Sequence, residues 1–135
     1  MDSIELTVET GAVPTITDLT SECADFVAGR NDGLLSVFVP HATAGVAIIE
    51  AGAGSDRDLL AAIDELLPDD TGRWSHQHGS PGHGRDHVLP GFISPTATIP
   101  VVAGELTLGT WQSVVLVDTN RDNRRRRVRL SFVGS

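Results

Sequence analysis

The sequence predicts an α+β fold in which two helices pack on an antiparallel or mixed β-sheet. Several short segments alternate apolar and polar residues, which is typical of half-buried strands. Two longer segments, 18–28 and 55–67, carry apolar residues at helical spacing. The chain has 135 residues, 40% hydrophobic and 21% charged, as expected of one globular domain spanning residues 1–135. A chain of this length can bury a core without disulfides or metals.

The first half of the chain contains the two predicted helices. Asp18 is a candidate N-cap for the first, and Pro68 ends the second. The run before Pro40 is almost continuously apolar and predicts a buried strand. In chain order we expect a strand at 4–9, a helix at 18–28, strands at 34–39 and 44–50, and a helix at 55–67.

Residues 69–86 are expected to form a loop, because this Gly-, Pro- and Asp-rich stretch sustains neither period. Loops of this length are uncommon in compact domains and are often functional. Short strands are expected after it, at 92–93, 99–102, 106–108, 114–117 and 128–133.

Charge and composition exclude several classes of protein. The net charge is −8 and all ten basic residues are Arg, which argues against general binding of nucleic acid or an anionic membrane. No apolar run approaches the ~20 residues that span a bilayer, and residues 1–5 lack the features of a signal peptide. Cys23 is the single cysteine and is expected to be a small buried thiol. We therefore expect a cytoplasmic protein.

Histidines are concentrated in the predicted loop, where four of the five lie between residues 74 and 87. The spacings of His76 with His78, and of His83 with His87, can present imidazoles to one metal ion. Individual loop histidines can equally be solvated or capping residues. His41 follows a core strand and is a candidate ligand or acid–base group, or a structural partner of the loop backbone.

Two other motifs carry candidate binding groups. In residues 109–112, Trp111 and Gln112 suit a wall for a planar heterocycle, although a core Trp is the alternative. The run 124–127 consists of four Arg residues, which suit an anion pocket. Salt bridges to carboxylates of the same chain or of a neighbouring subunit are the alternative. Alternate strand residues point to opposite faces, so at most two of these Arg can share a site.

Together these motifs resemble the YjbQ-like family. They are His41-Ala42-Thr43-Ala44 through Glu50, then His76, Asp86-His87, Leu108-Gly109-Thr110-Trp111-Gln112 and Arg124-Arg125-Arg126-Arg127-Val128. The resemblance covers nearly the whole chain and implies a small trimeric α+β protein. It also implies a secondary thiamine phosphate synthase activity, which joins an aminopyrimidine diphosphate to a thiazole phosphate.

The resemblance also implies which residues form the site. The implied catalytic residues, and tentative ligands of a divalent metal such as Zn²⁺ or Mg²⁺, are His41, His76 and His87. The implied groups that bind the small phosphorylated substrate are Thr43, Trp111, Gln112 and Arg126. A homotrimer would allow the site to be shared between subunits.

The chain departs from the family pattern at several positions. The family usually has Ser at Thr43, Asn before Glu50 and Gly-Pro before the first Arg of the run. His78 and His83 have no counterpart that we can place and rank below the other histidines. Two other functions use the same histidines: a non-catalytic oligomeric protein that binds a metal or small anion, and a metal-dependent hydrolase.

Overall fold

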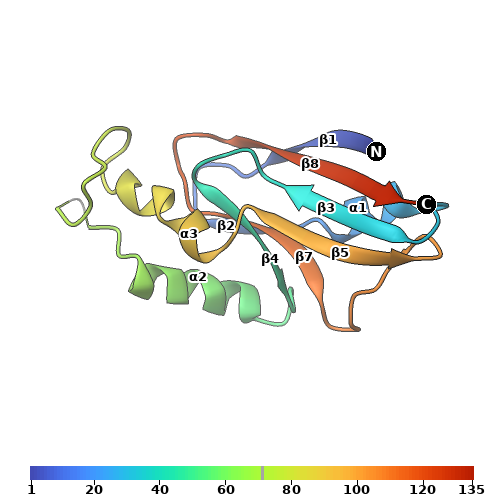
Figure 1. The fold of residues 1–135 in the computed structure, drawn as a ribbon. Helices are drawn as coiled ribbons and strands as arrows, with labels where there is room; N and C mark the ends of the chain where they lie inside the picture. Colours follow the sequence, from blue (N-terminus) through green and yellow to red (C-terminus); the bar gives the residue numbers. More distant parts are fainter. Residues whose placement is uncertain (71) are drawn as a thin grey trace.

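The computed structural model describes residues 1–70 and 72–135 and contains two antiparallel sheets and several helices (Figure 1). Thr71, within the predicted loop, lies outside the described residues. The strands are β1 (Asp2–Glu9), β2 (Thr15–Asp18), β3 (Gly33–Phe38), β4 (Ala44–Ile49), β5 (Thr96–Val102), β6 (Glu105–Leu106), β7 (Ser113–Asp118) and β8 (Arg125–Gly134). The helices are α1 (Thr20–Val27), α2 (Ser55–Leu66), the 3₁₀ helix η1 (His83–His87) and α3 (Leu89–Phe92).

The larger sheet has the strand order β1-β8-β3-β5-β6, and the smaller one has the order β2-β7-β4. Every pairing between the described strands is antiparallel, which confirms an α+β fold and resolves the choice between antiparallel and mixed. The sequence predicted one sheet, and the structure has two. Periodicity identifies strands but carries no information about which strands pair.

The smaller sheet lies between two hydrophobic clusters. One of its faces packs with the larger sheet and α1, through residues such as Val114 and Leu116. The other face, with Val115 and Val117, packs against Ile63 of α2 and its neighbours. Because β7 is buried on both faces, its four central residues are all apolar.

The two long helices lie where the sequence predicted them. The N-cap of α1 is Leu19 rather than the predicted Asp18, whose carboxylate accepts a hydrogen bond from the backbone N–H of Thr20 at 2.9 Å. Cys23 on this helix is fully buried, and burial raises the pKa of its thiol to about 12. No helix in residues 1–70 or 72–135 is long and apolar enough to cross a membrane.

Three predictions for the secondary structure were wrong. The expected strand at 92–93 is the end of α3, where Pro90 occupies the first helical turn that tolerates proline. The end of the expected loop forms η1, since a short 3₁₀ turn accommodates the nearby glycines. The strand before Pro40 is not buried throughout: Leu34 and Phe38 are 49% and 42% exposed because they face away from the core.

The segment from residue 72 to η1 forms one end of the fold, beyond α3 and opposite the chain termini (Figure 1). The C-terminal end of β7 and the start of β4 also point toward this end (Figure 1). Residues from the central strand and from one edge strand of the smaller sheet are thus brought close to the histidine-rich segment.

Candidate functional site

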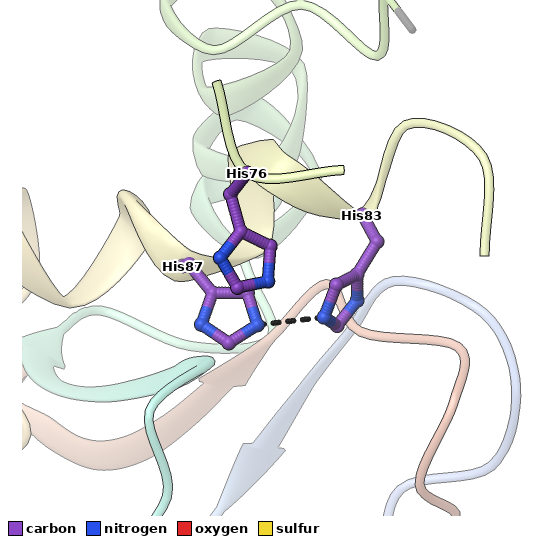
Figure 2. Close-up of side chains that lie close together, drawn as sticks. All are labelled: His76, His83 and His87. Carbon is purple, nitrogen blue, oxygen red and sulfur yellow. Dashed lines mark hydrogen bonds between the residues drawn. The ribbon is translucent and has the colours of Figure 1, made fainter. Parts of the chain in front are cut away.

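Three imidazoles converge at this end of the fold, and we call His76, His83 and His87 the histidine cluster. Each offers one ring nitrogen, and the three nitrogens lie within 4.8 Å of one another. The Nε2 atoms of His83 and His87 are 2.6 Å apart, and the ring of His76 stacks on that of His87 with centroids 3.9 Å apart (Figure 2). The exposed ring of His78 lies beside them, its centroid 3.9 Å from that of His76.

Two members of the cluster lie on η1, whose position is fixed by α2. Arg85, between His83 and His87, is almost fully buried. Its Nη1 donates to the carboxylate of Asp64 at 2.6 Å and to the carbonyl oxygen of Leu67 at 3.3 Å. These contacts tie η1 to the C-terminal end of α2, so the two imidazoles are held on a fixed turn.

A second contact ties η1 to the smaller sheet. The hydroxyl of Thr119, just after β7, donates to the buried carboxylate of Asp86 at 2.6 Å. Burial raises the pKa of Asp86, while Thr119, Arg85 and His83 act in the opposite direction. η1 is therefore anchored on both sides.

The third member comes from the preceding segment, which lies directly on η1. Gly84 makes this approach possible, since a Cβ at that position would lie 2.5 Å from the Cβ of Trp74 and 2.7 Å from the carbonyl oxygen of His76. The indole N–H of Trp74 donates to the carbonyl oxygen of Pro68 at 3.0 Å. His76 is thus held above the other two imidazoles.

The environments of His76 and His87 favour neutral imidazoles. Desolvation, and then the neighbouring imidazoles, lower the pKa of His76 and of His87. Among the described residues, Nε2 of His76 is buried without a hydrogen-bonding partner. A neutral imidazole with a free, buried ring nitrogen is the form that binds a metal ion.

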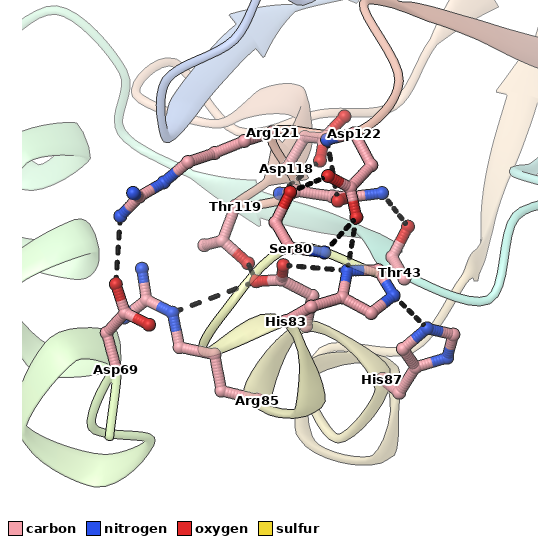
Figure 3. Close-up of polar contacts among 12 residues, drawn as sticks. Thr43, Asp69, Ser80, His83, Arg85, His87, Asp118, Thr119, Arg121 and Asp122 are labelled. Atoms are coloured by element: carbon pink, nitrogen blue, oxygen red, sulfur yellow. Dashed lines mark hydrogen bonds and ion pairs between the residues drawn. The ribbon is translucent and has the colours of Figure 1, made fainter. Parts of the chain in front are cut away.

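Carboxylates lie behind His83, on the side away from His87 (Figure 3). Oδ2 of Asp122 is 3.0 Å from Nδ1 of His83, and Oδ2 of Asp86 is 3.6 Å from it. Both are ion-pair distances without the alignment of a hydrogen bond. Ser80 donates to Asp122 through its hydroxyl and through its backbone N–H, the latter at 3.2 Å, and these bonds lower the pKa of that carboxyl.

Two residues expected to bind substrate, Arg126 and Thr43, lie in a buried polar network. Arg126 pairs with Asp118, and their side chains are 2% and 1% exposed. Nη2 of Arg126 also donates to the hydroxyl of Thr43 at 2.9 Å, which accepts a second bond from the amide of Asn120 at 3.1 Å. Neither Thr43 nor Arg126 belongs to the histidine cluster. Their contacts with Asn120 and Asp118 instead stabilise the chain at the C-terminal end of β7.

The remaining arginines of β8 pair with carboxylates of β1. Arg125 lies 2.7 Å from Glu9, while Arg129 and Arg127 lie 3.1 and 3.9 Å from Glu5. Of the alternatives for the arginine run, salt bridges within the chain are the one that the structure contains.

His41 lies apart from the cluster. Its Nε2 accepts a hydrogen bond from the backbone N–H of Arg127 at 2.9 Å. The pairing of β3 with β8 ends at Phe38 and Arg129. Beyond this pair, the imidazole of His41 takes the place of a β3 carbonyl as the acceptor for the N–H of Arg127. Burial, and then the charges of Arg126 and Arg127, lower the pKa of His41.

Trp111 and Gln112 also lie away from the cluster within one chain. They precede β7, whereas Thr119, which contacts η1, follows it. At about 3.3 Å per residue, the strand separates the two positions by roughly 20 Å. Trp111 is 72% exposed, and the side-chain oxygen of Gln112 accepts a hydrogen bond from the N–H of Gly109 at 2.8 Å.

The structure thus joins His76 and His87 with His83 rather than His41. The spacing of His83 and His87 predicted that these two imidazoles could meet, but the family resemblance favoured His41 over His83. Asp122 gave no signal, because the loop that carries it reaches His83 only in the folded chain.

These features define a class of protein, a two-sheet α+β scaffold with a histidine-rich centre at one end. The family described as UPF0047 protein YjbQ-like matches residues 4–135, and the chain belongs to this family. A UPF0047 protein of Mycobacterium tuberculosis is 59% identical over 98% of both chains. One from Archaeoglobus fulgidus is 31% identical over 91% of this chain and 95% of the relative.

Solved structures share the whole fold. A hypothetical protein from Aeropyrum pernix superposes with a TM-score of 0.89 at 34% identity and covers 100% of both chains. A YjbQ/UPF0047 protein from Clostridium acetobutylicum superposes with a TM-score of 0.86 at 28% identity, over 96% of this chain and 99% of that one. These relatives are described as hypothetical or uncharacterised, so they identify the family and its fold.

Proposed function

We propose that this protein is a metal-dependent enzyme acting on a small phosphorylated molecule, with His76, His83 and His87 as the metal ligands. The observation that carries the proposal is the convergence of three ring nitrogens within 4.8 Å. Three imidazole ligands with one open position are one of the ligand sets of catalytic zinc sites. Mg²⁺ prefers oxygen ligands, so the donor set favours Zn²⁺ over Mg²⁺.

The residues present fit such an ion. Zn–N bonds of ~2.0–2.1 Å require ligand nitrogens a little more than ~3 Å apart. The cluster brackets this spacing, because the Nε2 atoms of His83 and His87 are 2.6 Å apart and the three ligand nitrogens lie within 4.8 Å of one another. The buried Nε2 of His76 has no partner among the described residues, and the pKa values of His76 and His87 are lowered, so both can bind a cation as neutral imidazoles. When bound, the metal would act as a Lewis acid toward a phosphate oxygen.

The chain's own groups would then orient the substrate. His78 stands beside His76 and is exposed, so a ring N–H can donate a hydrogen bond to a phosphate oxygen from the solvent side. Anchoring of η1 by Arg85 and Asp86 keeps His83 and His87 in place while the substrate binds.

The family resemblance suggests a particular reaction, the coupling of an aminopyrimidine diphosphate to a thiazole phosphate with loss of diphosphate. Because Trp111 and Gln112 are separated by the length of β7, roughly 20 Å, from Thr119 beside η1, this reaction needs them from a neighbouring copy in the implied homotrimer. The exposure of Trp111 is compatible with such a contact.

Hydrolysis of a phosphorylated small molecule is the second candidate. It is favoured by the three-imidazole ligand set and by the position of Trp111 and Gln112, which precede β7 and so lie at its far end from Thr119 and η1. Hydrolysis needs only a metal centre and water, whereas the coupling also needs a pocket for two ring systems.

One assay separates the candidates. Metal-depleted protein, reloaded with Zn²⁺, is incubated with the aminopyrimidine diphosphate with or without the thiazole phosphate, and products are identified by mass spectrometry. Thiamine phosphate supports coupling, and the free pyrimidine alcohol supports hydrolysis. Either activity should vanish on chelation, return with Zn²⁺ and be absent in His83→Ala. Activity that survives both chelation and His83→Ala would refute the metal-dependent proposal.

A further inference from the structure

We propose that Asp122 is a positioning residue that orients His83 and fixes which of its ring nitrogens faces the cluster. The inference rests on the proposed metal site for its functional meaning, but its structural content can be tested without metal. Its basis is the opposed environment of the two nitrogens: Nδ1 lies 3.0 Å from Asp122, while Nε2 lies 2.6 Å from Nε2 of His87.

A neutral imidazole carries one proton, and the partner of one nitrogen determines the state of the other. A carboxylate beside Nδ1 of His83 favours the proton there, which leaves the lone pair of Nε2 directed at the cluster. A metal-binding histidine commonly has a carboxylate beside its other ring nitrogen, which raises its basicity as a ligand. Asp122 stands in this place at an ion-pair distance from Nδ1 of His83.

Asp122 is itself held in place (Figure 3). Ser80 donates to both of its carboxylate oxygens, and the N–H of Asp122 donates to the side-chain oxygen of Asn120 at 3.0 Å. The amide of Asn120 donates in turn to Thr43, which also accepts from Arg126. The buried network around Arg126 thus supports the loop that presents Asp122 to His83.

Asp86 is the other carboxylate near His83, but it is less suited to this role. Its Oδ2 is 3.6 Å from Nδ1, and its Oδ1 already accepts the hydrogen bond from Thr119. Its contacts with Thr119 and Arg85 instead anchor η1 to the rest of the fold. The shorter contact, from Asp122, is therefore assigned the positioning role.

The first test reads the protonated nitrogen directly. The two ring nitrogens of ¹⁵N-labelled histidine have distinct NMR signals, which can be recorded on metal-free protein about one to two pH units above the ordinary His pKa of 6.5. We expect His83 to carry its proton on Nδ1 in the parent chain and to lose this preference in Asp122→Ala. A proton on Nε2 in the parent, or an unchanged tautomer in Asp122→Ala, would overturn the proposal.

The second test measures the consequence for metal binding by titration with Zn²⁺. We expect Asp122→Ala to bind about 10–100-fold more weakly, as found for residues that orient metal-binding histidines. Asp122→Asn retains an acceptor oxygen and should recover part of the loss. Asp69→Ala is the matched control, because it removes a nearby carboxylate that pairs with Arg121 rather than with His83. It should stay within about twofold of the parent.

The outcomes are distinguishable from failure of the proposed function. If the parent binds no Zn²⁺, the metal-dependent function is wrong, while the His83 tautomer still decides whether Asp122 orients the ring. If the parent binds Zn²⁺ and Asp122→Ala binds as tightly, or Asp69→Ala loses as much, the positioning role is wrong. The Asp122→Asn variant decides the matter if Asp122→Ala fails to fold.

Discussion

Replacing Arg126 by Met should destabilise the protein strongly, because Arg126 neutralises a buried carboxylate. The side chains of Arg126 and Asp118 are 2% and 1% exposed. Removing the guanidinium leaves Asp118 without its counter-charge and takes one donor from Thr43. If Arg126 were mainly a substrate-binding group, the same change would reduce activity and leave stability almost unchanged.

The expected magnitude follows from this burial. Removing one partner of a buried ion pair costs about 3–5 kcal/mol, a large share of the ~5–15 kcal/mol by which a typical domain is stable. For a chain of this length, the loss corresponds to a fall in Tm of roughly 10–20 °C. Arg127→Met is the matched control: its pair with Glu5 is exposed and 3.9 Å long, so the change should cost less than about 1 kcal/mol.

Urea unfolding of the three proteins, followed by circular dichroism, measures both differences. A double variant, Arg126→Met with Asp118→Asn, should recover part of the loss because it removes the unpaired charge. Equal stability of Arg126→Met and Arg127→Met would refute this account of the buried pair.

Three further predictions concern single residues. The fold lowers the pKa of His41 below 6.5. The parent should therefore exceed His41→Gln in stability by the full amount above pH 6.5, and this difference should shrink as the pH falls below that value. A difference in urea midpoints that does not change with pH would contradict this prediction. Gly84→Ala should cost about 1–3 kcal/mol through its clash with Trp74, whereas Gly91→Ala, whose Cβ meets nothing within 4 Å, should cost far less in thermal melts. Cys23, with its pKa raised to about 12, should react with a thiol reagent only on unfolding; rapid labelling of native protein would be inconsistent with its burial.

Much of the fold could be predicted from local patterns. Alternation along β1 and the helical stripe of α2 are visible in sequence because each element buries one face. β2 was not predicted, since its four residues are too few to establish a period. The division into two sheets depends on pairings between residues far apart in the chain, such as those of β7 with β2 and β4.

The site could be predicted only in part. Four histidines within a Gly-rich segment indicated where imidazoles would gather, and His76 and His87 do meet. His41 is not part of the cluster, because its position after a strand leaves its direction open in the sequence and its side chain turns toward the N–H of Arg127. For Arg126 the sequence left two roles open, an anion pocket and a salt bridge. Strand alternation did not show that the buried side chain of Arg126 would meet Asp118.

The central claim is that the histidine cluster binds one divalent metal ion. Titration of metal-depleted protein with Zn²⁺ by isothermal calorimetry tests it most directly. We predict about one ion per chain for the parent and for His41→Ala, and loss of this binding in His83→Ala. Absence of binding in the parent, or binding that survives His83→Ala but not His41→Ala, would contradict the claim.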